Sequence, residues 1–239
     1  MHRPPAQPVH RSVVPVTGFS ACGGDHLADY APRVAGIVIN SVEQLREIID
    51  EPSKLVAEKA IDHIDPESRR FIEGSPFFLL ATSAADGACD VSPRGDPPGS
   101  VLVLDERTIA FGDRKGNRRL DSLCNILSQP QVGMLFLVPG MGETVRLNGT
   151  ARIVRDAPYA DRLTVRGVRP ELTIEISVVE LYLHCAKAFK RSALWEPDSW
   201  PERGELPTGG QLLRSQGEFA ASAKELDDYL TNSYRTTMY

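Results

Sequence analysis

The chain has 239 residues, of which 41% are hydrophobic and 25% are charged, and its net charge at pH 7 is −5. A chain of this length can bury about 70–75% of its unfolded surface, so it can fold without disulfides or structural metals. The composition is that of an ordinary globular protein. The negative charge argues against general binding to nucleic acid or to an anionic membrane, although it allows a local basic pocket.

The sequence shows no pattern typical of a metal site, a signal peptide or a membrane-spanning segment. The five histidines are scattered, and the four cysteines lie far apart, at Cys22, Cys89, Cys124 and Cys185. This pattern predicts reduced, mostly buried thiols and no protein-built metal site. The N-terminus lacks the apolar stretch of a signal peptide, and no run of 18 apolar residues occurs. We therefore expect a cytoplasmic protein that does not enter the membrane.

Three regions follow from the pattern along the chain. Residues 1–36 are proline-rich and are expected to form an irregular arm, residues 37–200 one main domain, and residues 201–239 a helical C-terminal extension. Helix-start signals predict three short helices ahead of the strands, at Ser41 with Gln44 (to about Asp50), at Ser53, and at Asp65-Pro66 (to near Gly74). We expect these helices to cover one end of a barrel.

From Pro76 the pattern changes to that of strands. Short apolar or alternating runs predict strands at 77–82, 89–93, 100–104, 108–111, 132–138, 144–154 and 173–183. Asp86-Gly87 indicates a hairpin, Asp105-Glu106 a second turn, and Asn148-Gly149 a bulge or bend. With one central helix, this pattern predicts a mainly β (α+β) fold built on a small barrel, and a further helix is expected near 221–234.

The central helix begins beside a cluster of cations. Apolar residues recur at helical spacing from Leu120 to Leu127, Pro130 prevents continuation, and Asn117 is the expected N-cap. Arg118 and Arg119 would then lie in the first turn, where the helix dipole already disfavours positive charge. A bound phosphate would resolve this conflict, and a solvated basic face is the alternative.

Several motifs in the same order carry a family resemblance. The segment from Phe111 to Val138 resembles the flavin-phosphate region of the pyridoxamine 5′-phosphate oxidase-like, FMN-binding split β-barrels. Further matching segments are Val91 to Gly99, Pro139 to Gly149 and His184 to Ala188, so the resemblance covers roughly residues 36–200. Within this family, the chain is similar to one bacterial subgroup whose members are uncharacterised. The resemblance implies a flavoprotein with the split-barrel fold.

The resemblance also implies roles for individual residues. The phosphate of FMN would be held by Asn117, Arg118 and Arg119, with Arg114 and Lys115 as further candidates, and Asp113 of the same turn is also expected to contact the cofactor. The strand along the flavin ring would be Val91, Ser92, Pro93, Arg94 and Gly95, with Arg94 as the cation near the ring or, alternatively, in a surface salt bridge. Thr144 and Arg146 would come from the second subunit of a homodimer, and a hydroxyl at Thr144 replaces the family's glutamine.

The C-terminal part departs from the vitamin oxidases of the family. Their Arg-x-His-Asp-Arg type segment, which clamps pyridoxal phosphate, has no counterpart after Trp195. The small-molecule substrate is therefore left open, with His184, Lys187, Arg191 and Trp195 as candidates for its side of the flavin. The leading interpretation is an FMN-dependent oxidoreductase. The alternative is a non-catalytic protein that binds flavin, deazaflavin or haem, with His184 as the candidate axial ligand.

Overall fold

The computed structural model describes residues 36–239, and the chain divides into two compact units, Met1–Glu51 and Pro52–Tyr239. Residues 1–35 of the expected arm, with Cys22, lie outside the described residues. The described part of the first unit contains α1 (Val42–Arg46). Ser41 Oγ accepts a hydrogen bond from Gln44 N, and Gln44 Oε1 accepts one from Asn40 N, so the predicted capping pair forms. The helix ends earlier than the expected Asp50.

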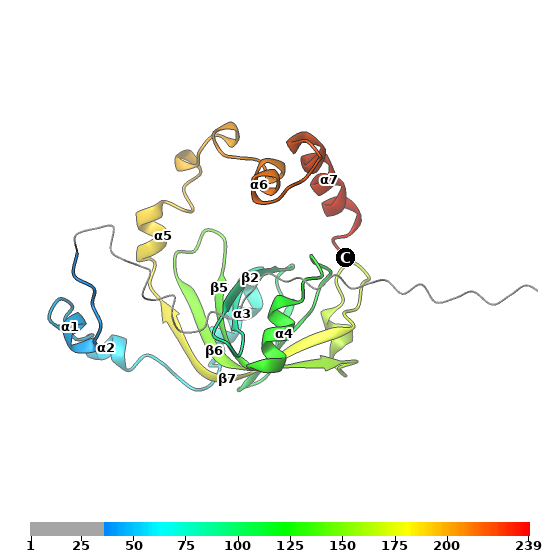
Figure 1. Cartoon of the computed structure of the whole chain (residues 1–239). Coiled ribbons are helices and arrows are strands. Elements are labelled where there is room, and N and C mark those ends of the chain that lie inside the picture. Colours follow the sequence, from blue (N-terminus) through cyan, green and yellow to red (C-terminus); the bar gives the residue numbers. More distant parts are fainter. Residues whose placement is uncertain (1–35) are drawn as a thin grey trace, which may run out of the picture. The chain divides into compact units, whose positions relative to one another are not determined.

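The second unit is built on a seven-stranded sheet in the order β2-β1-β5-β6-β7-β4-β3 (Figure 1). All neighbouring strands are antiparallel. The strands are β1 (Phe77–Ser83), β2 (Cys89–Gly95), β3 (Val101–Asp105), β4 (Thr108–Gly112), β5 (Gln131–Leu137), β6 (Thr144–Arg155) and β7 (Leu172–His184). Because β2 and β3 are the two edges, the sheet is open. The predicted mainly β fold with peripheral helices is confirmed.

One glycine fixes the irregularity between the two longest strands. Asn148 pairs with Glu180 whereas Gly149 pairs with Val178, so Val179 is the extra residue of a bulge. A Cβ atom at position 149 would lie 2.3 Å from the carbonyl oxygen of Ser177, which only glycine avoids. The bulge predicted at Asn148-Gly149 is confirmed, with the extra residue on the partner strand.

Alternate strand residues form the hydrophobic core on one face of the sheet. Fully buried examples are Leu80, Met134, Phe136, Leu147, Ile174 and Ile176. The helix α3 (Pro66–Gly74) contacts β3 and β6, and α4 (Asp121–Ser128) contacts β1, β2 and β6. They bury Ile72 and Ile126 there. In contrast, α2 (Lys54–Ala57) buries no residue, so the expectation that three helices cover the barrel is wrong for α2.

The central helix starts later than the sequence predicts. It begins at Asp121, after Leu120 in a left-handed conformation with φ 64°, and Arg118 has φ 62°. Asn117 is not its N-cap, because its Oδ1 accepts a hydrogen bond from Arg119 N at 3.0 Å and closes a turn instead. Arg118 and Arg119 therefore precede the helix, and the prediction that they occupy its first turn is wrong.

The C-terminal region is a series of short helices. After β7 they are α5 (Lys187–Ser192), η2 (Pro197–Ser199), η3 (Arg203–Glu205), α6 (Gly209–Gln216) and α7 (Ala223–Thr236), whereas the short η1 (Ala160–Leu163) lies between β6 and β7. The predicted last helix is confirmed as α7, which has a capping box between Ser222 and Glu225. It packs on the unpredicted α6, where Gly210 N donates to Asp227 Oδ1 at 2.7 Å. Within residues 36–239, no helix combines the length and the apolar character needed to span a membrane.

Candidate functional site

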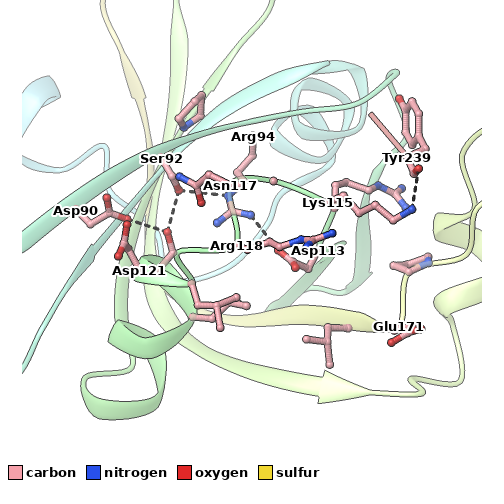
Figure 2. A pocket seen from close by; sticks show the side chains of 18 of the residues that line it. Asp90, Ser92, Arg94, Asp113, Lys115, Asn117, Arg118, Asp121, Glu171 and Tyr239 are labelled. Carbon is pink, nitrogen blue, oxygen red and sulfur yellow. Dashed lines mark hydrogen bonds and ion pairs between the residues drawn. The ribbon is translucent and has the colours of Figure 1, made fainter. Parts of the chain in front are cut away.

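The basic turn and the edge strand β2 face one cavity of about 700 Å³ (Figure 2). This volume lies within the range of sites for small molecules and cofactors. Its lining includes nine of the predicted cofactor residues: Val91, Ser92, Pro93, Arg94, Asp113, Arg114, Lys115, Asn117 and Arg118. Gly95 and Arg119 do not line it. The first turn of α4 and residues 168–172 complete the wall, together with Tyr239.

The start of α4 presents unused hydrogen-bond donors to this cavity. Leu120 provides no side-chain cap, and the N–H groups of Asp121, Ser122 and Leu123 donate to no acceptor within residues 36–239. The side chain of Arg118 lines the same cavity and makes no ion pair or hydrogen bond with the described residues. Free N–H groups, a helix N-terminus and an unpaired guanidinium together favour an anion.

The other cations of the turn already have partners. Arg114 Nε contacts Asp96 Oδ2 at 2.6 Å, and the Arg114 side chain is only 15% exposed. The guanidinium of Arg119 turns away to Asp121 Oδ2 at 2.8 Å. Lys115 Nζ donates to the carbonyl oxygen of Tyr239 at 3.0 Å. Within the described chain, Arg118 is therefore the cation of this turn that is free to meet a ligand.

Arg94 is held on the floor of the cavity by a hydrogen-bonded network. Its Nη1 contacts Asp113 Oδ1 at 3.1 Å and its Nε donates to Ser92 Oγ at 3.2 Å (Figure 2). Ser92 Oγ lies 3.0 Å from Ser122 Oγ, which donates to Asp90 Oδ2 at 2.8 Å. Arg94 and Asp113 are 22% and 23% exposed, so their ion pair faces the cavity rather than open solvent.

A second, more apolar cavity of about 360 Å³ is lined by residues of β1, β5 and β6, and Val91 of β2 lines both cavities. It brings together Thr144, Arg146 and His184 from the ends of β6 and β7. Burial lowers the pKa of His184, and the nearby positive charges of Arg146 and Lys59 lower it further, which favours the neutral imidazole.

The remaining substrate-side candidates line neither of these two cavities. Lys187 and Arg191 are exposed on α5. Trp195 stacks on Phe189 with ring centroids 5.9 Å apart, and its Nε1 donates to the carbonyl oxygen of Met141 at 2.7 Å. These contacts tie the segment after β7 to the loop before β6. Trp195 therefore anchors the packing of these two segments.

The expectation of mostly buried thiols is wrong, because Cys89, Cys124 and Cys185 are all exposed. Cys89 begins an edge strand, Cys124 lies on the outer side of α4, and Cys185 follows the last strand. No group of three or more histidine, cysteine or acidic residues within 36–239 is placed to hold a metal ion.

Sequence reasoning missed several residues that line the first cavity, among them Asp90, Ser122 and Tyr239. Asp90 and Ser122 had a detectable signal, since Asp90 adjoins the predicted site residue Val91 and Ser122 follows Arg119 by three residues. Tyr239 had none, because it reaches the cavity from the far end of the described chain.

Comparison with known proteins assigns the chain to a family. Residues 64–185, just over half of the chain, match the family model described as pyridoxamine 5′-phosphate oxidase. No curated protein matches.

Similar solved structures include HupZ from Group A Streptococcus (21% identity over 49% of this chain and 91% of that chain, TM-score 0.40). Others are an FMN-binding protein from Syntrophomonas wolfei (11% identity, 48% and 82%, TM-score 0.38) and the haem storage protein HutZ from Vibrio cholerae (14% identity, 51% and 94%, TM-score 0.35). These likenesses are distant, and the family match is what assigns the chain. The chain belongs to the pyridoxamine 5′-phosphate oxidase-like family.

Proposed function

We propose that the chain binds FMN, with the phosphate at the start of α4. The observation that carries the proposal is the set of unused N–H groups at Asp121 to Leu123 beside the unpaired Arg118, in a cavity large enough for a nucleotide. Such donors match phosphate oxygens in charge and geometry. Arg114, in contrast, supports the wall through its buried ion pair with Asp96.

The cavity floor supplies the second part of the proposed site. When bound, FMN provides hydride or electron transfer, while the protein binds and orients it. Arg94 on β2 would lie along the ring, where a positive charge favours the reduced anionic form. We infer an oxidoreductase acting on a small molecule, and the missing C-terminal clamp argues against pyridoxal phosphate as that molecule.

The second cavity supports a homodimer. It is an apolar hollow on the sheet of a single chain, lined by Leu79, Leu135 and Phe189 among others. Arg146 is exposed beside it and contacts the Tyr182 hydroxyl at 3.0 Å. In a dimer, this face would complete the flavin site of the partner. Thr144 would act there only after rearrangement, since it is 2% exposed within its own subunit.

The test is the affinity for FMN of Arg118→Ala, with Arg119→Ala as the matched control. Loss of charge-assisted hydrogen bonds worth about 1.5–3 kcal/mol predicts roughly ten- to a hundredfold weaker FMN binding for Arg118→Ala. Arg119→Ala should weaken FMN less, because that guanidinium is paired with Asp121. Riboflavin, which lacks the phosphate, should bind both variants as it binds the unmodified chain. Equal losses for FMN and riboflavin would place Arg118 in the scaffold.

Haem is the second candidate, favoured by one observation. His184 lines an apolar cavity, and its lowered pKa favours the neutral imidazole, which is the form that ligates haem iron. The visible spectrum of the purified protein discriminates the two, since haem gives a Soret band and oxidised flavin does not. The compound released by heat should be FMN, and stoichiometric haem or FAD would overturn the FMN proposal.

A further inference from the structure

A line of three hydrogen bonds crosses the floor of the first cavity and ends on Arg94 (Figure 2). It begins at Asp90 on β2, passes through Ser122 at the start of α4, and returns to Ser92 on β2. Its last bond joins Ser92 Oγ to Arg94 Nε. The line thus connects a helix terminus to the guanidinium that the proposed site places along the flavin.

The direction of every bond in this line is determined by the two ends. A serine hydroxyl has one hydrogen to donate, a carboxylate only accepts, and an arginine N–H only donates. Ser122 gives its hydrogen to Asp90, so its oxygen must accept the hydrogen of Ser92. Ser92 has then no hydrogen left, and its lone pairs face Arg94 Nε. The carboxylate of Asp90 therefore orients a hydroxyl two residues along its own strand.

We propose that Asp90, Ser122 and Ser92 form a positioning relay that holds the Arg94 guanidinium in place for the reduced flavin. The inference rests on the proposed FMN site. Arg94 is fixed at Nε by Ser92 and at Nη1 by Asp113, which leaves Nη2 for the cofactor. Ser122 is 4% exposed, so bulk water cannot easily replace its hydroxyl. Asp90 and Ser122 act through Arg94 and are positioning residues.

The test measures the reduction potential of bound FMN in Ser122→Ala. This change breaks the relay without altering any charge. A less firmly held Arg94 should weaken the binding of reduced FMN relative to oxidised FMN by about three- to tenfold, and tenfold is about 30 mV for a two-electron couple. The potential should therefore fall. Ser128→Ala is the control, because Ser128 lies at the other end of α4 and its hydroxyl donates to Asn125 O.

A double-mutant cycle with Arg94→Ala separates a relay from a local packing effect. If Ser122 acts through Arg94, then Ser122→Ala should shift the potential in the unmodified chain and should not shift it in the Arg94→Ala background. A shift of equal size in both backgrounds, or no shift in either, would overturn the relay. Failure of the unmodified chain to bind FMN would instead overturn the proposed function.

Asp90→Asn provides a second route if Ser122→Ala does not fold. A carboxamide can donate as well as accept, so it no longer imposes one direction on the two hydroxyls. Removing the charge of Asp90 should affect the potential similarly with and without Arg94, so the difference between the two backgrounds reports the relay alone. The measured quantity is the affinity for reduced FMN relative to that for oxidised FMN. If the effect of Asp90→Asn on this ratio differs by less than about 1.5-fold between the two backgrounds, the relay is overturned.

Discussion

At the scale of single residues, Glu175 shows how this chain satisfies a buried charge. Its carboxylate on β7 is 8% exposed and accepts hydrogen bonds from Arg152 Nε and from the Tyr159 hydroxyl, each at 2.6 Å. Burial raises the pKa of Tyr159 to about 12, and the bond to Glu175 also raises it. Tyr159 therefore keeps its proton in the folded state at a pH where it would lose it in the unfolded chain.

This shift predicts a pH dependence of stability. Because the folded pKa of Tyr159 is above its ordinary value of 10.0, the folded state binds more protons than the unfolded state between about pH 10 and pH 12. The stabilisation is present below pH 10 and should be lost as the pH rises through this range. Urea unfolding of the unmodified chain and of Tyr159→Phe should give free energies that converge as the pH approaches 12. A constant difference would contradict the assignment.

The role of a side chain could be predicted from the sequence where that role depends on residues close to it in the chain. The cations at Arg114 to Arg119 indicated an anion site, and the structure places Arg118 on the cavity without a described partner. The sequence could not show that Arg114 pairs with Asp96, because the contact depends on how a loop and an edge strand meet. Nor could it show that Arg94 contacts Asp113, 19 residues away.

At the scale of elements, the close packing of β6 on β7 depends on Gly149. A Cβ atom there would overlap backbone atoms of Ser177, which cannot move without breaking the ladder. We expect Gly149→Ala to lower the free energy of unfolding by about 3 kcal/mol, the upper end of the usual range for overpacking. Gly133→Ala is the matched control, since its added Cβ would meet only side-chain atoms, the nearest at 3.4 Å. Denaturant unfolding measures both, and equal losses would contradict this reasoning.

The contact of Tyr239 with the cavity gives a second prediction for elements. Its hydroxyl donates to Asp96 Oδ1 at 3.0 Å, and the Arg166 guanidinium lies 5.4 Å from its ring centroid. Tyr239→Phe removes a hydrogen bond worth about 0.5–1.5 kcal/mol, so release of FMN should become roughly two- to tenfold faster. Tyr234→Phe is the control, because Tyr234 is 62% exposed. Stopped-flow release of FMN should separate them, and identical rates would remove Tyr239 from the site.

The strands were more predictable than the helix that borders the site. The apolar runs predicted as strands form β1 and β5, in which burial alternates along the strand, and the hairpin at Gly87 forms with φ 89°. The start of α4 was placed three residues early because Asn117 is a good N-cap by type. Two left-handed residues, Arg118 and Leu120, interrupt the helix instead, and neither is a residue type that indicates this conformation.

At the scale of the whole molecule, the proposed homodimer makes a prediction about mass and binding. Light scattering should give about twice the chain mass of 26.2 kDa. Leu135→Glu places a charge in the second cavity and should yield monomers that bind FMN at least about tenfold more weakly, a cost of about 1.4 kcal/mol. Leu127→Glu is the control, since Leu127 is 77% exposed on α4. A monomer with unchanged affinity would remove Arg146 from the flavin site.

The whole molecule was the least predictable level. Family motifs within residues 64–185 indicated the fold, because those residues carry the local patterns of strands and turns. The hairpin of α6 and α7 depends on a close approach at Gly210, where a Cβ atom would lie 2.0 Å from the carbonyl oxygen of Ala223. Such contacts between distant segments leave no periodic signal in the sequence.

The position of Pro93 has a consequence for the solubility of the protein. β2 is an edge strand, and exposed edges are templates on which other chains can add strands and aggregate. Proline has no N–H to offer, so an incoming strand would meet a gap in the ladder at the middle of β2. Association through this edge is therefore disfavoured. Pro93, which lines the first cavity, thus also keeps this edge of the open sheet from adding strands of other chains.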